Sequence, residues 1–187
     1  MKRPKHRIFS AVLLITSLIS CREMSEIVHD AEAGLNGGFE VVKEGKPVNW
    51  LLYTMKTVPT GDFDISIDNN TYHGGNGSLR INVIECDPSG GNLSPGFATE
   101  IPATPDRNHS LSFWVKNNGT EFVVHAGGVS AMSGNMQMLV KSDESAAEWT
   151  YHEYTIPVSE AFDRFRISIN VLSPGSFWID DINIRVL

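Results

Sequence analysis

An aromatic ring that could bind a ligand, the indole of Trp114, lies in the segment Ser110–Lys116, where polar and apolar residues alternate. Leu111, Phe113 and Val115 alternate there with polar residues, and Trp114 falls in the polar phase. Because successive side chains of a strand point to opposite faces, we expect Trp114 to project outward from a sheet. An exposed aromatic ring suits the apolar face of a sugar. The alternative is a ring that packs under a loop or stands alone on the surface.

Outward positions on other alternating segments are candidates for the same surface. The segments are Phe122–Ala126, Met136–Val140 and Phe165–Val171, and each presents polar residues between apolar ones. The candidate residues in them are His125, Gln137, Arg166 and Asn170. The sequence does not determine whether these segments share one sheet with Trp114.

The chain carries little that resembles a catalytic centre. Glycoside hydrolysis needs two carboxylates placed across one bond, and the acids of Asp62–Asp68 have no second acidic strand to face them. The Gly-x-Ser-x-Gly nucleophile elbow is absent from the sequence, and the histidines are scattered without the spacing of a zinc site. Cys86 has no basic neighbour in the sequence to activate its thiol. We therefore predict that the protein is not an enzyme.

From Asn36 onward, short β-branched and aromatic runs alternate with clusters of Gly, Pro, Asn and Asp, which indicates a sandwich or barrel. No helical period extends beyond a turn near Ser159–Phe162. The predicted strands are Phe39–Val42, Trp50–Tyr53, Phe63–Asp68, Ser78–Val83, Phe97–Ile101, Ser110–Lys116, Phe122–Ala126, Met136–Val140, Trp149–Ile156, Phe165–Val171 and Phe177–Val186. So many strands in one domain, 36–187, fit an all-β sandwich of two antiparallel sheets.

The N-terminus has the order of a secretory signal over residues 1–20. A basic start precedes an apolar run from Ile8 to Ile19, which is shorter than the about 20 residues that cross a bilayer. The segment Leu18-Ile19-Ser20-Cys21 resembles the lipobox of bacterial lipoproteins. This resemblance implies cleavage after Ser20 and acylation of Cys21. The alternative is an ordinary cleaved signal with an incidental cysteine.

Composition restricts the partners of the mature chain. Loss of the signal removes four cations and no acids, which takes the formal net charge from −7 to −11. Such an acidic domain has no electrostatic reason to bind nucleic acid, because that affinity comes from cations on phosphates. Residues 21–35 are polar, small and acidic after the cysteine, and we predict that they tether the lipid to the domain. A short helix at Glu26–Ala33 is the alternative.

A series of segments, taken in order, resembles carbohydrate-binding modules of families 4, 9 and 22. The segments are Asn36–Glu40 with Trp50 nearby, His73–Ile81, Leu111–Lys116, Trp149 and Phe177–Ile182. The resemblance implies a galactose-binding-like jelly roll over 36–187, with the first and last strands side by side. It also matches Trp50, Trp149 and Trp178 to structural positions, so we expect all three in the core.

The same resemblance implies a structural calcium ion where the first and last strands meet. Ca²⁺ binds carboxylate, carbonyl and water oxygens. Glu40 and Asp180 would supply carboxylates. The loop that contains Gly74 and Asn76 would supply carbonyls, because glycine lets a backbone approach an ion closely. The alternative is a solvated Asp180, with Glu40 capping the chain or pairing with a cation.

These observations predict non-catalytic polysaccharide binding by a lipoprotein of the bacterial cell envelope. Its lipid would anchor it to the membrane, on the periplasmic or the surface face of the outer membrane. The expected partners are a glycan and the membrane, without nucleic acid. The alternative is a structural or interaction lipoprotein that keeps the fold without sugar binding and docks to an envelope protein.

Overall fold

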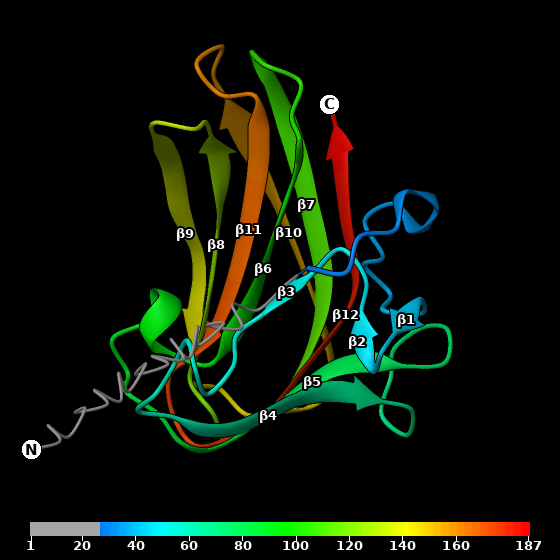
Figure 1. The fold of residues 1–187 in the computed structure, drawn as a ribbon, viewed down its shortest axis with the longest axis vertical. Coiled ribbons are helices and arrows are strands. Elements are labelled where there is room, and N and C mark those ends of the chain that lie inside the picture. Colours follow the sequence, from blue (N-terminus) through cyan, green and yellow to red (C-terminus); the bar gives the residue numbers. More distant parts are fainter. Residues whose placement is uncertain (1–26) are drawn as a thin grey trace, which may run out of the picture.

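The computed structural model describes residues 27–187, so the predicted signal peptide, Cys21 and the first part of the tether lie outside the described residues. Two five-stranded antiparallel sheets and a small hairpin make up the domain (Figure 1). The helical elements within 27–187 are two 3₁₀ turns, Ala31–Ala33 and Gly91–Leu93. None of the helices in this range has the length and hydropathy to cross a membrane. The predicted all-β, two-sheet sandwich is confirmed.

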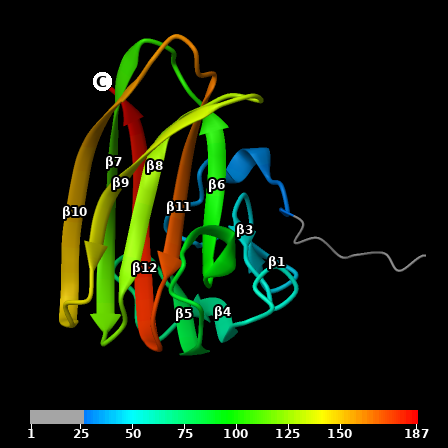
Figure 2. The same cartoon turned by 90° about the vertical axis from the view of Figure 1, so that its left-hand side faces the viewer.

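We name each sheet after its middle strand. The β12 sheet has the order β10-β7-β12-β5-β4, and the β11 sheet has the order β3-β6-β11-β8-β9. The strands of the β12 sheet are β4 (Asp62–Asp68), β5 (Ser78–Glu85), β7 (Arg107–Asn118), β10 (Ala146–Val158) and β12 (Gly175–Val186). The strands of the β11 sheet are β3 (Leu51–Leu52), β6 (Gly96–Pro102), β8 (Phe122–Val129), β9 (Gly134–Ser142) and β11 (Arg164–Val171). Figure 2 shows β6, β11, β8 and β9 side by side, and the hairpin pairs β1 (Val42–Lys43) with β2 (Lys46–Pro47).

Strand alternation builds the core between the sheets. On β7, the apolar side chains of Leu111, Phe113 and Val115 are buried, as are those in the matching phase of β11. The rings of Phe39, Trp50 and Phe97 add an aromatic cluster, with centroids 5.3 to 6.1 Å apart. Burial of this apolar surface stabilises the packing of one sheet on the other.

The first and last segments of the domain lie side by side, as the resemblance implied. The Ile182 amide donates to the Gly37 carbonyl at 2.9 Å, next to a shift in the β12–β7 register between Asp180 and Asn183. A Cβ on Gly37 would lie 1.8 Å from the Ile182 carbonyl oxygen. Only glycine permits this approach of the two segments.

Residues 28–35 pack against the domain. The Asn49 backbone amide donates to the Val28 carbonyl at 2.8 Å. The Asn49 side-chain amide donates to the carbonyls of Asp30 and Gly34 at 2.7 and 2.8 Å, and its oxygen accepts the Asp30 N–H at 2.9 Å. The domain therefore begins before the predicted boundary at Asn36, and the described half of the predicted tether is bound to it.

Candidate functional site

The residues predicted for one binding surface lie on two different sheets. Trp114 is on β7 of the β12 sheet, whereas His125, Gln137, Arg166 and Asn170 are on β8, β9 and β11 of the β11 sheet. The sheets pack face to face, so outward residues of one sheet point away from those of the other. The predicted group therefore divides into two surfaces.

The outer face of the β11 sheet carries a groove of about 630 Å³, a volume typical of small-ligand sites. Strands β3, β6 and β11 form its floor, and the segment from Ile27 to Leu35 forms one wall. The floor residues are Leu51, Ala98, Glu100, Arg164 and Arg166. Of the predicted residues, Arg166 is therefore placed in a concave site.

Two arginines and one glutamate give the groove its charged groups. Arg166 lies opposite Glu100 across the β11–β6 pair, with its Nε 3.5 Å from Glu100 Oε1. The Arg164 guanidinium contacts the other oxygen, Glu100 Oε2. The exposed fractions of the Arg164, Arg166 and Glu100 side chains are 37%, 39% and 30%. Because a guanidinium carries five donors in a planar fork, donors remain for a ligand.

His125 shares this outer face with Arg166. It lies opposite Ser168 in the β11–β8 pairing, and Ser168 is two residues after Arg166 on β11. Burial lowers the pKa of His125, which keeps its imidazole neutral at pH 7. His125 is thus a neutral hydrogen-bonding group beside the groove.

Asn170 and Gln137 do not face the groove. Asn170 is fully buried, and its amide donates to the carbonyls of Gly91 and Ser94 at 2.7 and 3.2 Å. It holds a covering turn in place. Gln137 lies opposite the core residue Ala126 and therefore faces inward. The β8–β9 register shifts between Val124 and His125, and this shift turns the side chain of Gln137 from the outer face to the inner face of the sheet. Asn170 lies in the outward phase of β11 but is covered by this turn, and Gln137 faces inward, so the predicted ligand-facing position of each residue is wrong.

Trp114 projects outward from the β12 sheet, but other rings cover it. His73, in the loop between β4 and β5, stacks on the indole with centroids 3.9 Å apart and planes at 14°. Tyr151, opposite Trp114 on β10, lies 5.1 Å from it at 49°. This geometry agrees with the alternative interpretation, in which Trp114 packs under a loop.

Glu40 and Asp180 both bind the loop between β4 and β5. Asp180 Oδ2 accepts the backbone N–H groups of His73 and Gly74, at 2.8 and 3.1 Å. Glu40 accepts the backbone N–H and the side-chain amide of Asn76, at 2.8 and 3.1 Å. The predicted meeting of these residues is therefore observed.

The arrangement of these residues does not fit a calcium ion. From the sequence we expected the loop to turn carbonyl oxygens toward an ion held by the two carboxylates. In the structure the loop instead donates its N–H groups directly to both carboxylates. The positive ends of N–H dipoles repel a cation. Within residues 27–187, no group of three or more acidic, imidazole or thiol side chains is placed to hold a metal. Calcium binding stays a prediction from the sequence.

Asp180 is an unusual titratable group because its side chain is fully buried. Burial raises its pKa to about 6, against the opposing effect of N–H donors from Gly74, His73 and Asp181. Asp181 in turn contacts His73 Nδ1 through its Oδ2 at 2.7 Å. The loop, the C-terminal strand and these two acids thus form one polar cluster.

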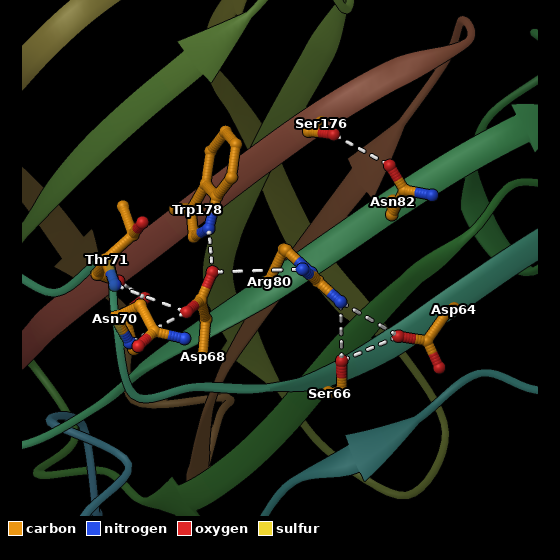
Figure 3. Close-up of polar contacts among 10 residues, drawn as sticks. Asp64, Ser66, Asp68, Asn70, Thr71, Arg80, Asn82, Ser176 and Trp178 are labelled. Carbon is orange, nitrogen blue, oxygen red and sulfur yellow. Dashed lines mark hydrogen bonds and ion pairs between the residues drawn. The ribbon is translucent and has the colours of Figure 1, made fainter.

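A second surface on the β12 sheet was missed by the sequence analysis. Trp178 and Trp149 are half-exposed, so their predicted core positions are wrong, whereas Trp50 is buried as expected. Trp178 lies on the outer face, and its Nε1 donates to Asp68 Oδ2 at 2.9 Å (Figure 3). The sequence contained a signal for this position, because Trp178 lies between the apolar residues Phe177 and Ile179, both of which are buried.

No protein-family model and no curated protein sequence matches the chain. Its fold is nevertheless that of solved structures. The enzymatically active domain of tailspike protein 4 from bacteriophage CBA120 matches with a TM-score of 0.61 at 19% identity, over 81% of this chain and 21% of that chain. The CBM22-1–GH10 modules of xylanase Xyn10B from Clostridium thermocellum, complexed with xylohexaose, match with a TM-score of 0.57 at 20% identity, over 74% and 26%. This chain thus spans about a fifth and a quarter of those two chains.

A family 4 carbohydrate-binding module matches over nearly its whole length. The TM-score is 0.57 at 17% identity, over 81% of this chain and 98% of that chain. Matches with these TM-scores, at identities of 17 to 20%, show the fold alone, a two-sheet jelly roll shared with carbohydrate-binding modules.

Proposed function

We propose that the protein is a non-catalytic module that binds a neutral polysaccharide in the groove of the β11 sheet. The observation that carries the proposal is the groove of about 630 Å³ with Arg164, Glu100 and Arg166 on its floor. The shared jelly-roll fold, and a structural neighbour solved with xylohexaose, support a saccharide as the ligand.

The groove offers both kinds of contact that a sugar ring needs. The guanidinium groups of Arg164 and Arg166 donate to hydroxyl oxygens, and the Glu100 carboxylate accepts hydroxyl protons. Leu51 on the floor and Leu35 in the wall supply apolar surface for the C–H faces of the ring. The chain carries a formal net charge of −7, which disfavours strongly anionic polymers.

The carboxylates of the groove suit binding better than hydrolysis. Asp30 forms an ion pair with Lys43 at 3.0 Å, and this contact lowers the pKa of Asp30. Glu100 is held by two arginines. A general acid must carry a proton at the working pH, whereas Asp30, with its lowered pKa, remains ionised. We therefore expect no release of reducing sugar from any polysaccharide that the protein binds.

The membrane anchor belongs to the same proposal. We infer from the lipobox that acylated Cys21 holds the module in the bacterial cell envelope. Metabolic labelling with an alkyne fatty acid tests this inference. Wild-type protein should carry the label and fractionate with membranes, and Cys21→Ala should do neither. Equal labelling of the two proteins would contradict it.

Affinity gel electrophoresis of the soluble protein against neutral polysaccharides tests the groove. Arg166→Ala should weaken binding about ten-fold, because it removes a central polar contact. Arg185→Ala is the matched control, since Arg185 pairs with Glu153 on the other sheet and is 60% exposed. Retardation of Arg166→Ala equal to that of wild type would reject the groove as the site.

A further inference from the structure

We propose that the protein has a second saccharide-binding surface, on the outer face of the β12 sheet and centred on Trp178 and Arg80. Its ligand is an uncharged polysaccharide chain. This surface and the groove lie on different sheets, so binding at one can be tested independently of binding at the other.

Cross-strand pairing arranges this surface in two neighbouring rows. The first row contains Ser66, Arg80, Trp178 and Lys116. The second row contains Asp64, Asn82, Ser176 and Asn118. Both rows cross β4, β5, β12 and β7, and neighbouring strands lie about 4.8 Å apart. Each row is therefore about 14 Å long, which is longer than one sugar ring.

The Trp178 ring is held in a fixed orientation. Its Nε1 donates to Asp68 Oδ2 at 2.9 Å, and Asp68 Oδ1 accepts the backbone N–H groups of Asn70 and Thr71 at 2.9 and 3.2 Å (Figure 3). Burial works to raise the pKa of Asp68, but these hydrogen bonds outweigh it and lower the pKa. An indole fixed in this way can stack on a sugar with little further loss of conformational entropy.

The Arg80 guanidinium, beside this ring, has N–H donors that are available to a ligand. Its closest polar contacts are long, 3.5 Å to Ser66 Oγ and 3.6 Å to Asp64 Oδ2, and its side chain is 38% exposed. Asp64 is more exposed, at 62%, and provides a carboxylate acceptor beside these donors. Together they can bind neighbouring hydroxyl groups of one sugar.

The balance of charge indicates that the ligand is uncharged. Two acids, Asp64 and Asp68, are matched by two bases, Arg80 and Lys116, although the chain as a whole is acidic. An anionic polymer would find no excess of positive charge on this surface. A half-exposed indole among neutral amides and hydroxyls favours a polyhydroxylated chain with apolar ring faces.

Affinity gels with a neutral xylan, a β-glucan and a galactomannan, with polygalacturonate as the anionic probe, test this second surface. The informative background is Arg166→Ala, in which we expect binding by the groove to be about ten-fold weaker. We expect this variant to keep residual retardation in at least one neutral gel, and addition of Trp178→Ala to reduce it about ten-fold or more. Trp178→Phe, which keeps an aromatic ring at this position, should retain most of the residual binding.

The outcomes separate this surface from the groove. Equal retardation with and without Trp178→Ala, at unchanged melting temperature, would overturn the second surface and leave the groove standing. Retardation by polygalacturonate that depends on Trp178 would overturn the uncharged ligand. If Trp178→Ala fails to fold, Arg80→Gln takes its place, and full binding by that folded variant would refute the proposal.

Discussion

The buried carboxylate of Asp180 leads to a prediction about stability and pH. The folded protein raises the pKa of this group from 3.8 to about 6, so the folded state binds the proton more tightly than the unfolded state. Stability from this group is therefore greatest at low pH and is lost as the pH rises through 6. Asp180→Asn removes this titration while it keeps the shape of the side chain.

The size of the effect follows from the shift. Over the whole titration it is at most about 3 kcal/mol, at about 1.4 kcal/mol for each pKa unit. Between pH 7.5 and pH 5 the wild type should gain about 1.4 kcal/mol relative to Asp180→Asn. In a chain of this size, that corresponds to a change of about 3 to 6 °C in the difference between the two melting temperatures.

Thermal unfolding of both proteins at several pH values measures this difference. Carboxylates with lowered pKa, such as Glu40 and Asp68, act in the opposite direction, but both proteins contain them. The neighbouring His73 and Asp181 are also common to the two proteins. Parallel melting curves between pH 5 and pH 7.5 would refute the reasoning, because they would show that burial does not perturb Asp180.

Three further predictions concern the same parts of the fold. Asn49→Ala should release residues 28–35 from the domain, seen as faster amide hydrogen exchange there, and unchanged exchange would contradict the docking role of Asn49. Gly75→Ala should lower the melting temperature more than Gly45→Ala, because both positions have positive φ but only a Cβ at Gly75, 2.0 Å from Glu40 Oε1, would push Glu40 away from Asn76; similar losses would refute this packing argument. Calcium or EDTA should leave the melting temperature unchanged, because N–H groups satisfy the two carboxylates, and a rise with calcium would restore the expectation from sequence.

Much of the fold could be predicted because its strands alternate. The pattern of β5, β7 and β11 placed their buried residues correctly, since a one-residue change of phase would expose the core. The meeting of the two ends of the domain was implied by the resemblance to carbohydrate-binding modules, and Gly37 and Ile182 realise it in the structure. The strand alternation is a local signal and is read directly from residue types.

The candidate site was harder to predict because it depends on non-local pairing. No pattern within β7 or β11 shows that Trp114 and Arg166 belong to opposite sheets. The inward turn of Gln137 comes from a register shift, and the burial of Asn170 comes from a covering turn. For Trp178, the phase of the strand would have indicated an outward position, but the family resemblance led us to expect it in the core.

The central claim is that the floor of the β11-sheet groove contacts a saccharide. Amide chemical shifts during titration of the soluble mature protein with a neutral oligosaccharide test it most directly. We expect saturable shifts that include Ala98, Glu100 and Arg166, and the docked segment 28–35. Binding that leaves all of these amides unshifted would contradict the claim.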